Sequence, residues 1–460
     1  MIARPAIALL ILGSALAPAL VSNVSRAGGA SAAPAPASPS AAGAAVVDAK
    51  PLWAALEPLY RDLHAHPELS FQETATAAKL ADRLKGLGYE VTAGVGRTGV
   101  VGVLENGSGE TVMLRTDMDA LPVEEKTGLP YASRATATDA GGRTVPGMHA
   151  CGHDVHMTAW MGAATWLAGN RKAWSGTLLL VGQPAEESGG GARAMLEDGL
   201  FTRFPRPGAA LAIHVMEVLS AGTIGIKAGP VMASADSVDL VVHGRGGHGA
   251  RPSTTVDPIV IAAKIVVGIQ TLVSRENDPF DPAVVTVGSF HAGTKHNIIP
   301  DEARLQLTVR AFRQEVRDRL LKGIERIAKA EAEAANAPRP PEVRVLESIG
   351  PTVNDARLAG RVEAALRRGL GDARVRPGVT LMAAEDFSQY SEAGVPILML
   401  SLGAANREAF ERAQREGTAL PGLHSPLFAP DPEPTITTGV EALVTAALDL
   451  FGAKEGARDR

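Results

Sequence analysis

Short apolar runs alternate with helix-like segments along most of the chain. The strand-length runs occupy residues 100–104, 111–116, 176–182, 209–213 and 397–401. Apolar residues at helical spacing predict helices over residues 51–87 (interrupted around 64–70), 155–164, 192–199, 355–370 and 435–451. Strands that are apolar throughout are typical of parallel sheets buried on both faces. The pattern predicts an α/β fold, with a mixed, mostly parallel sheet and helices on both faces.

The rhythm changes between residues 233 and 348. Strands are predicted at residues 237–244, 283–290, 304–312 and 342–347, with helices at 257–274 and 314–335. This β-α-β-β-α-β order is that of a ferredoxin-like α+β domain. We therefore expect an inserted domain over residues 233–348, which divides the first domain into residues 48–232 and 349–456.

The first residues have the order of a secretory signal. One positive charge precedes an apolar stretch of about 16 residues, and sites with small residues follow it. The stretch is short for a membrane span of ~20 residues, so cleavage is favoured over an uncleaved anchor. We interpret residues 1–27 as a signal peptide and residues 28–47, rich in Ala, Pro, Ser and Gly, as a flexible linker. The mature protein is expected to be exported, to the periplasm or outside the cell, without a stable membrane span.

Composition narrows the choice of partner and cofactor. The 460 residues are 45% hydrophobic and carry a formal charge of −5, so no basic surface argues for nucleic acid as a partner. Residues 94–99 match G-x-G-x-x-G, but a predicted strand follows where a dinucleotide-binding motif needs a helix. Neither nucleic acid nor a dinucleotide is therefore expected.

Residues able to bind metal follow several of the predicted elements. Asp117 and Asp119, Glu186 and Glu187, and His214 follow three apolar strands, where parallel sheets collect functional residues. Cys151, the only cysteine of the chain, and His153 precede the helix at residues 155–164. His424 follows the last strand.

Cys151 and His153 are expected to lie on one side of an extended segment, and the helix N-terminus is expected to favour the thiolate. A buried thiol beside surface histidines is the simpler alternative for Cys151 alone. Thiolate, imidazole and carboxylate together suit zinc best, with manganese, cobalt or nickel as alternatives.

The adjacent carboxylates Glu186 and Glu187 indicate hydrolysis. If the segment is extended, the two side chains point to opposite sides, so that one binds metal while the other acts as general base. The chain has no G-x-S-x-G and no H-E-x-x-H motif, so a serine hydrolase or a helix-borne zinc protease has no support.

The sequence resembles the M20 metallopeptidase superfamily, in its amidohydrolase branch of hippurate hydrolases and N-acyl amino acid (auxin-conjugate) hydrolases. The resemblance covers residues from about 50 to 450. The matching stretches are residues 61–69 (RDLHAHPEL), 117–122 (DMDALP), 148–154 (MHACGHD), 183–187 (QPAEE), 246–252 (GGHGARP), 296–301 (HNIIPD) and 384–387 (AEDF). The C-G-H-D and E-E segments are specific for this branch.

The resemblance implies a two-metal site with Glu186 as general base. The implied ligands are Cys151, His153, Glu187, His214 and His424. It also implies that the inserted domain forms a homodimer or a higher homo-oligomer, in which His248 reaches the active site of a neighbouring subunit and polarises the scissile carbonyl. Asn297 and Arg310 are then expected to contact the substrate.

Departures and simpler alternatives bear on these roles. Arg115 stands where the carboxypeptidase-like branches have a ligand histidine, so Asp117 and Asp119 are expected to support the ligands rather than to bind metal. The simpler alternatives are that His248 is a surface residue, that Arg310 belongs to a cross-strand ion pair, and that Glu385 and Asp386 cap a helix. His64 and His66 are expected to pack or to support the site.

We therefore predict an exported, di-metal amidohydrolase that cleaves the amide bond of N-acyl amino acids or small peptide-like substrates. A dipeptidase or aminoacylase of the same superfamily is one alternative. A non-catalytic exported protein that binds metal or peptide is the other, and Glu186 argues against it because binding alone does not need a base.

Overall fold

The structure is a computed structural model that describes residues 47–452. The predicted signal peptide and linker therefore lie outside the described residues, except for Val47, which is buried in the core. The last predicted residues of the first domain, 453–456, lie outside them as well.

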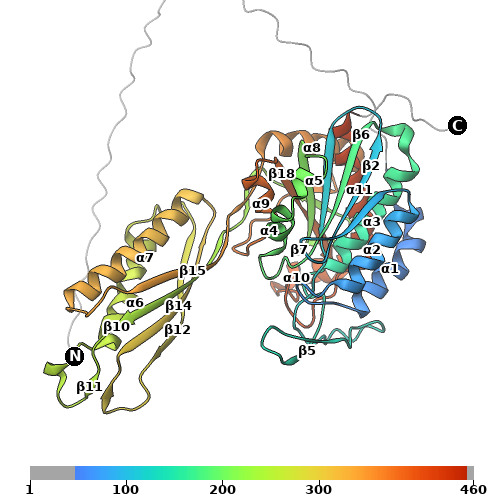
Figure 1. Ribbon diagram of the computed structural model, residues 1–460. Coiled ribbons are helices and arrows are strands. Elements are labelled where there is room, and N and C mark those ends of the chain that lie inside the picture. Colours follow the sequence, from blue (N-terminus) through green and yellow to red (C-terminus); the bar gives the residue numbers. More distant parts are fainter. Residues whose placement is uncertain (1–46, 453–460) are drawn as a thin grey trace, which may run out of the picture. The chain divides into compact units, whose positions relative to one another are not determined.

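An eight-stranded sheet forms the centre of the first domain, as Figure 1 shows. Its strands, in spatial order, are β1 (Glu90–Val95), β2 (Gly99–Asn106), β6 (Gly176–Gln183), β3 (Thr111–Asp117), β7 (Ala209–Ser220), β18 (Ile397–Ala405), β8 (Ile224–Ile226) and β17 (Val375–Pro377). The four central strands β6, β3, β7 and β18 are parallel, whereas β1, β2 and β8 each have antiparallel neighbours. The predicted mixed, mostly parallel sheet is confirmed.

Helices cover both faces of this sheet (Figure 1). One face packs against α1 (Trp53–Ala65), α2 (Thr74–Gly86), α3 (His153–Gly169), α8 (Ala356–Leu370) and α11 (Pro432–Phe451). The other packs against the shorter α4 (Gly191–Glu197), α5 (Leu200–Arg203) and α9 (Ser388–Glu392). Helix α3 is buried nearly all round, which explains its uniformly apolar sequence.

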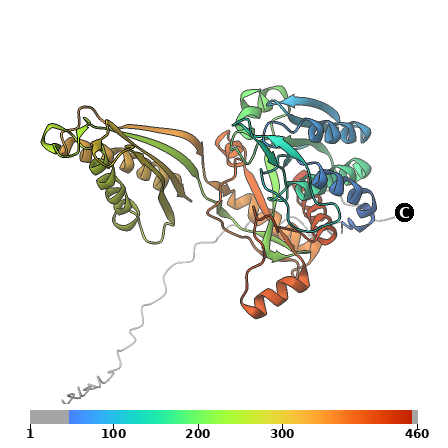
Figure 2. The same ribbon diagram turned by 90° about the horizontal axis from the view of Figure 1, so that it is seen from below.

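The inserted domain has its own core and the predicted order of elements. These are β10 (Ala235–His243), α6 (Pro258–Arg275), β12 (Ala283–Ala292), β14 (Glu302–Ala311), α7 (Gln314–Ala334) and β15 (Glu342–Ile349). The antiparallel sheet has the order β12-β14-β10-β15, and both helices pack on one of its faces (Figure 2). The ferredoxin-like prediction is confirmed.

Helix α6 is the one described helix that is long and apolar enough to cross a membrane by length and composition. Its Ile261, Ile265 and Ile269 are buried against the sheet, however, so that this face belongs to a protein core. The opposite face leaves Val260 and Val267 exposed. Helix α6 therefore presents apolar side chains both to the core and to the surface.

Several elements are absent from the sequence prediction. A hairpin of β4 (Thr136–Thr138) and β5 (Thr144–Pro146) lies in the long polar loop, and α10 (Arg407–Glu416) lies in the loop before His424. Strands β9 (Gly229–Met232) and β16 (Thr352–Asn354) pair where the chain enters and leaves the inserted domain, and β11 (Gly247–His248) pairs with β13 (Ile298–Ile299). The strands among these segments are too short for a periodic pattern, and α10 is a short, mostly polar helix.

Candidate metal centre

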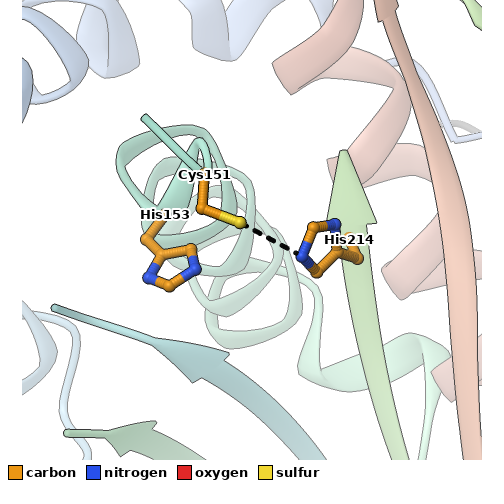
Figure 3. A group of neighbouring side chains, drawn as sticks. All are labelled: Cys151, His153 and His214. Carbon is orange, nitrogen blue, oxygen red and sulfur yellow. Dashed lines mark hydrogen bonds between the residues drawn. The ribbon is translucent and has the colours of Figure 1, made fainter. Parts of the chain in front are cut away.

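The predicted ligands converge at the carboxyl end of the central strands. Cys151 and His153 come from the N-terminus of α3, and Figure 3 shows their side chains near that of His214 on β7. The Sγ atom of Cys151 lies 3.5 Å from Nε2 of His214. Glu187 follows β6, and His424 lies in the loop before α11. The structure therefore brings all five residues together at one site.

The segment from Cys151 to His153 is a turn, so the predicted extended conformation is wrong. Gly152 has φ 77°, and His153 is the first residue of α3. A Cβ atom on Gly152 would lie 2.6 Å from Cγ2 of Val215, which leaves no room for another residue. The left-handed glycine, rather than an extended strand, brings the thiol and the imidazole to the same side.

Both buried histidines have one ring nitrogen engaged and one left for a ligand. His153 places Nδ1 2.8 Å from the carbonyl oxygen of Asp119, and His214 places Nδ1 2.9 Å from that of Val215. A carbonyl accepts only from an N–H group, so Nε2 carries the lone pair in each neutral ring. Nε2 of His153 is buried without a hydrogen-bond partner among the described residues.

His214 lies within β7 and not at its end, which corrects the sequence prediction. The strand continues to Ser220 because its pairing with β18 extends past His214. The pairing of β7 with β3, by contrast, stops at Ala212. His214 therefore stands where the neighbouring strand has ended, and its side chain is free to face the site.

Glu186 and Glu187 lie in a tight turn, so their predicted opposite orientation is also wrong. Ala185, just before them, has φ 51°. Nε2 of His153 lies 3.9 Å from Oε2 of Glu186 and 3.8 Å from Oε1 of Glu187. The turn aims both carboxylates at the same imidazole, which extended backbone does not allow.

Asp117 and Asp119 hold the ligands in place, as expected. The two carboxylate oxygens of Asp119 accept the N–H groups of Glu186 (3.0 Å) and Glu187 (3.1 Å). Asp117 Oδ1 lies 2.8 Å from Nδ1 of His156, a further ligand-type residue of α3 to which the sequence assigned no role. Nε2 of His156 accepts the N–H of Val215, next to His214, so it joins two sides of the site.

Arg115 is fully buried beneath the site and binds three carboxylates. Its guanidinium donates to Asp117 (2.8 Å), Glu385 (2.8 Å) and Asp386 (3.2 Å). Glu385 also accepts the N–H of Phe387, but α9 has no side-chain cap, so the helix-capping alternative is wrong. Glu385 is bound mainly by Arg115, about 270 residues away in sequence, whereas Asp386 also accepts from Nε2 of Gln183 at 2.7 Å.

The protein alone leaves an excess of negative charge in the site. Burial, followed by Glu385 and Glu187, raises the pKa of Glu186 well above its usual range. Burial raises the pKa of Glu187 to about 7. Burial, followed by Glu187 and Glu186, raises the pKa of Cys151, so the thiolate expected at the helix N-terminus depends on a bound cation. Bound cations would relieve all three groups at once.

The donor geometry fits metal ions. Cys151, His153 and His214 form one group of ligand atoms that all lie within 4.8 Å of one another, and Cys151, Glu187 and His424 form a second. The two groups share Cys151. Oε1 of Glu187 is buried without a hydrogen-bond partner among the described residues and lies 3.6 Å from Nε2 of His424. A bound metal ion would satisfy the lone pairs of such a buried, unpaired oxygen.

A cleft of about 760 Å³ opens beside these residues. It is lined by Cys151, Glu186, Glu187, His214 and His424 and also by Arg310 of β14. The guanidinium of Arg310 is half-buried and has no hydrogen bond or salt bridge to another described residue. Burial lowers its pKa, and the charge of Asp236 offsets this effect only in part.

His248 and Asn297 do not line the cleft of their own chain. Both are exposed and lie together at the small β11–β13 pair, where the N–H of Gly249 donates to the carbonyl of Asn297. Nδ1 of His248 accepts the N–H of Ala250 at 3.0 Å, so Nε2 carries the proton in the neutral ring. The structure thus brings together the predicted ligands, Glu186 and Arg310, but not these two residues.

The other histidines that sequence reasoning considered divide between core and surface. His64 is buried between Asp154 (2.7 Å) and Glu125 (3.1 Å), whereas His66 is exposed. His243 is buried beside Glu342, and His291 and His296 are exposed. These five residues lie outside the metal-ligand groups.

Comparison with known proteins identifies the family. Residues 113–419, more than half of the chain, match the profile of Peptidase family M20/M25/M40. The chain belongs to the M20 family. The matched range includes every predicted metal ligand except His424, and it spans the inserted domain.

Curated and solved M20 proteins resemble this chain over most of its length. A hippurate hydrolase from Campylobacter jejuni is 40% identical over 343 residues, which cover 73% of this chain and 85% of the relative. An N-acetyl-L-cysteine deacetylase from Bacillus subtilis is 37% identical and covers 72% of this chain and 76% of its own. A dinuclear metal-binding M20 peptidase from Bacillus subtilis superposes with a TM-score of 0.72 at 30% identity, covering 88% of this chain and all of its own. This chain is thus an M20-type hydrolase.

Proposed function

We propose that the protein is a metal-dependent amidohydrolase that cleaves the amide bond of N-acyl amino acids or small peptide-like substrates. The observation that carries the proposal is the turn of Glu186 and Glu187. It places one carboxylate among the ligand atoms and the other 3.9 Å from the same imidazole, inside a cleft. Glu186 also lies within ligand distance of His153 and Glu187, but the five other ligands suffice for two ions, which leaves its carboxylate free to act on a water molecule.

Two divalent ions per chain would be held by Cys151, His153, Glu187, His214 and His424. Such ions activate water and polarise a carbonyl group. The mixed sulfur, nitrogen and oxygen donors favour zinc over manganese, cobalt and nickel. The presence of two ligand groups that share Cys151 supports two ions rather than one.

Glu186 acts as the general base and then as the general acid. Its carboxylate takes a proton from the attacking water and returns that proton to the nitrogen of the leaving amino acid. The raised pKa of Glu186 suits both steps, because a base that is too weak cannot accept the proton. Arg115 holds Glu385 and Asp386 in place and keeps a positive charge beneath this group of acids.

Arg310 recognises the carboxylate of the amino acid half of the substrate. It is the half-buried, unpaired cation of the cleft described above, and a guanidinium binds a carboxylate in a bidentate manner. Hippurate and N-acetylcysteine, which the names of the relatives contain, both carry such a carboxylate next to the amide. A carboxypeptidase-like cleavage of short peptides would use the same contact.

The protein forms a homodimer through the inserted domain, and His248 and Asn297 serve the partner's cleft. Val260 and Val267 on α6 and Phe290 on the edge strand β12 are exposed large apolar side chains in one domain. Such a surface is typical of an interface. Nε2–H of His248 can donate to the oxygen of the scissile carbonyl, and Asn297 lies beside it.

The protein acts after export, in the periplasm or outside the cell. The order of charge, apolar stretch and small residues at the N-terminus supports this part of the proposal. Cell fractionation of the tagged full chain tests it: processing and appearance in the exported fraction are expected, and an unprocessed cytosolic protein would contradict it.

The function is tested with the purified mature protein. Metal content is measured by mass spectrometry, and hydrolysis is followed for N-acetyl and N-benzoyl amino acids, dipeptides, and matched substrates whose carboxyl group is amidated. We expect about two metals per chain, cleavage of free acids in preference to amidated ones, and loss of activity on chelation that metal restores. Metal-loaded protein that hydrolyses none of these amides would contradict the proposal and favour a binding protein.

A further inference from the structure

The turn that carries Glu186 and Glu187 is held by two buried carboxylates from elsewhere in the chain. Oε1 of Glu73 accepts the N–H of Ala185 at 2.8 Å, and Asp119 accepts the next two N–H groups. Ala185 has φ 51°, a left-handed conformation that costs a residue with a Cβ atom about 1 kcal/mol or more. The turn therefore depends on contacts that hold Ala185 in place.

Glu73 has no exposed surface and stands directly before α2. It accepts hydrogen bonds from the N–H of Phe71 (2.9 Å), the N–H of Ala185 and the hydroxyl of Thr98. No salt bridge joins it to a cation among residues 47–452, although a buried carboxylate is costly without one. All the hydrogen bonds that this buried carboxylate accepts come from loop residues, so we expect its role to be to hold those loops in place.

The Gly-rich segment at residues 94–99 completes this arrangement. It supplies Thr98 to Glu73, and the guanidinium of Arg97 lies 3.9 Å from the ring centre of Phe71. A Cβ atom on Gly96 would meet the backbone nitrogen of Met195 at 2.6 Å. The glycine thus lets the segment pack closely against α4, beside the turn of Glu186.

We propose that Glu73 is a positioning residue for the general base: through the N–H of Ala185 it fixes the left-handed turn that aims Glu186 into the site. The inference rests on the proposed function, because it takes Glu186 as the base. Oε1 of Glu73 accepts whether or not the carboxyl group is protonated, so the hold on Ala185 depends on an acceptor at this position and not on its charge.

The variants Glu73→Gln and Glu73→Leu separate this role from a general effect on folding. Glutamine keeps an acceptor for both N–H groups, and the hydroxyl of Thr98 can rotate to accept from its amide. We expect kcat of Glu73→Gln to stay within about threefold of the parent, and kcat of Glu73→Leu to fall about tenfold to a hundredfold, with KM and metal content unchanged. Equal losses in both variants, in step with lost metal or lost thermal stability, would contradict positioning.

Crystal structures of the two variants provide a readout that does not need turnover. In Glu73→Leu we expect residue 185 to leave the left-handed region and the carboxylate of Glu186 to move away from His153, whereas Glu73→Gln keeps both. An unchanged turn in Glu73→Leu would overturn the inference whatever the enzyme hydrolyses. Failure of the proposed function would instead show as a parent enzyme that hydrolyses no amide of the panel.

A second change tests the route through Ala185. Glycine adopts a positive φ without the steric cost, so Ala185→Gly should reduce the dependence of the turn on Glu73. We expect kcat of the double variant Glu73→Leu/Ala185→Gly to exceed that of Glu73→Leu by about threefold or more. Strictly additive effects of the two changes would show that Glu73 does not act through Ala185.

Discussion

The metal centre and the His248 loop of the inserted domain are built in opposite ways. At the metal centre, His153 is about 1% exposed, and its Nδ1 lies against a carbonyl oxygen that fixes the orientation of the ring. In the loop, His248 is exposed and is oriented only by the N–H of Ala250. Folding of one chain thus fixes the proposed ligands. The residues proposed to contact the substrate carbonyl do not line the cleft of their own chain and would need a partner subunit to reach one. If the protein forms the proposed dimer, one chain alone can bind metal, but turnover requires assembly.

The sharpest test of the buried side is Glu186→Gln. The amide cannot accept the proton of the attacking water, so we expect kcat to fall about 10³-fold, within the range for loss of a general base. Metal content should stay at the parental value, because Glu187 and the other ligands remain. Glu187→Gln is the matched control, and it should lower metal content as well as activity. Metal loss in Glu186→Gln would show that this residue is a ligand rather than the base.

The exposed side is tested by His248→Ala, for which we expect a fall in kcat of about 10²-fold with full metal content. If His248 serves the partner's cleft, mixing His248→Ala with Glu186→Gln under conditions of subunit exchange should restore activity. A mixed dimer then has one cleft with both a base and a donor. Recovery in the mixture, measured against each variant alone, sharpens the comparison. No recovery despite proven subunit exchange would place His248 in its own cleft or outside the reaction.

Arg310 lies between the two regions, because the inserted domain carries it but it lines the cleft. Loss of a charge-assisted hydrogen bond typically costs about 1.5–3 kcal/mol, so Arg310→Ala should raise KM about tenfold to a hundredfold for substrates with a free carboxylate. Arg310→Lys should fall between the parent and Arg310→Ala, since lysine keeps the charge but not the bidentate geometry. Amidated substrates provide the control, and their KM should not change. A similar loss for amidated substrates would remove the carboxylate from this contact.

The residues of the candidate metal centre were easier to predict from the sequence than their conformation. The near-continuous apolar strands indicated a parallel sheet, and a parallel sheet brings the ends of distant strands together, so the ligand set followed from topology. The conformation of Gly152 and Ala185 did not, because each turn depends on a tertiary contact: the close approach of Val215 in one case and the acceptor of Glu73 in the other.

The residues that support the ligands were the hardest to foresee. Arg115 pairs with Glu385, which is far away in the sequence, and no local sequence pattern predicts this ion pair. The only sequence signal at Glu73 is an acid directly before a helix, which is also typical of a helix cap. His214 was misplaced at a strand end because the apolar run stops there, while the pairing of β7 with β18 continues. Sequence patterns report which face a residue shares with its neighbours, and not which distant residue completes its hydrogen bonds.

The smallest expected effect concerns His424, whose side chain is 55% exposed and therefore departs from the buried character of the other ligands. Its loop is held at His424 itself, whose N–H donates to the carbonyl of Ala150, and at Pro426, whose carbonyl accepts the N–H of Lys126. The neighbouring Glu125 is bound to His64 of α1 at 3.1 Å. Burial works against protonation of His64, but Asp154 and Glu125 outweigh it and raise its pKa to about 10. This ion pair ties the His424 side of the site to the core.

A raised pKa gives a defined pH dependence. The unfolded chain releases the proton of His64 at about pH 6.5, whereas the folded protein keeps it to about pH 10. The stability due to this group is therefore fully present below pH 6.5 and is lost as the pH rises toward 10. Glu125→Gln removes one of its two anionic partners, so we expect the free energy of unfolding at pH 6 to fall by about 1–2 kcal/mol and the loss between pH 6.5 and 10 to become shallower. Urea titrations across this range measure both, with Glu124→Gln, an exposed neighbour, as the control. A pH dependence that is unchanged in Glu125→Gln would mean that Asp154 alone holds the proton on His64, and that the His424 loop is not anchored through Glu125.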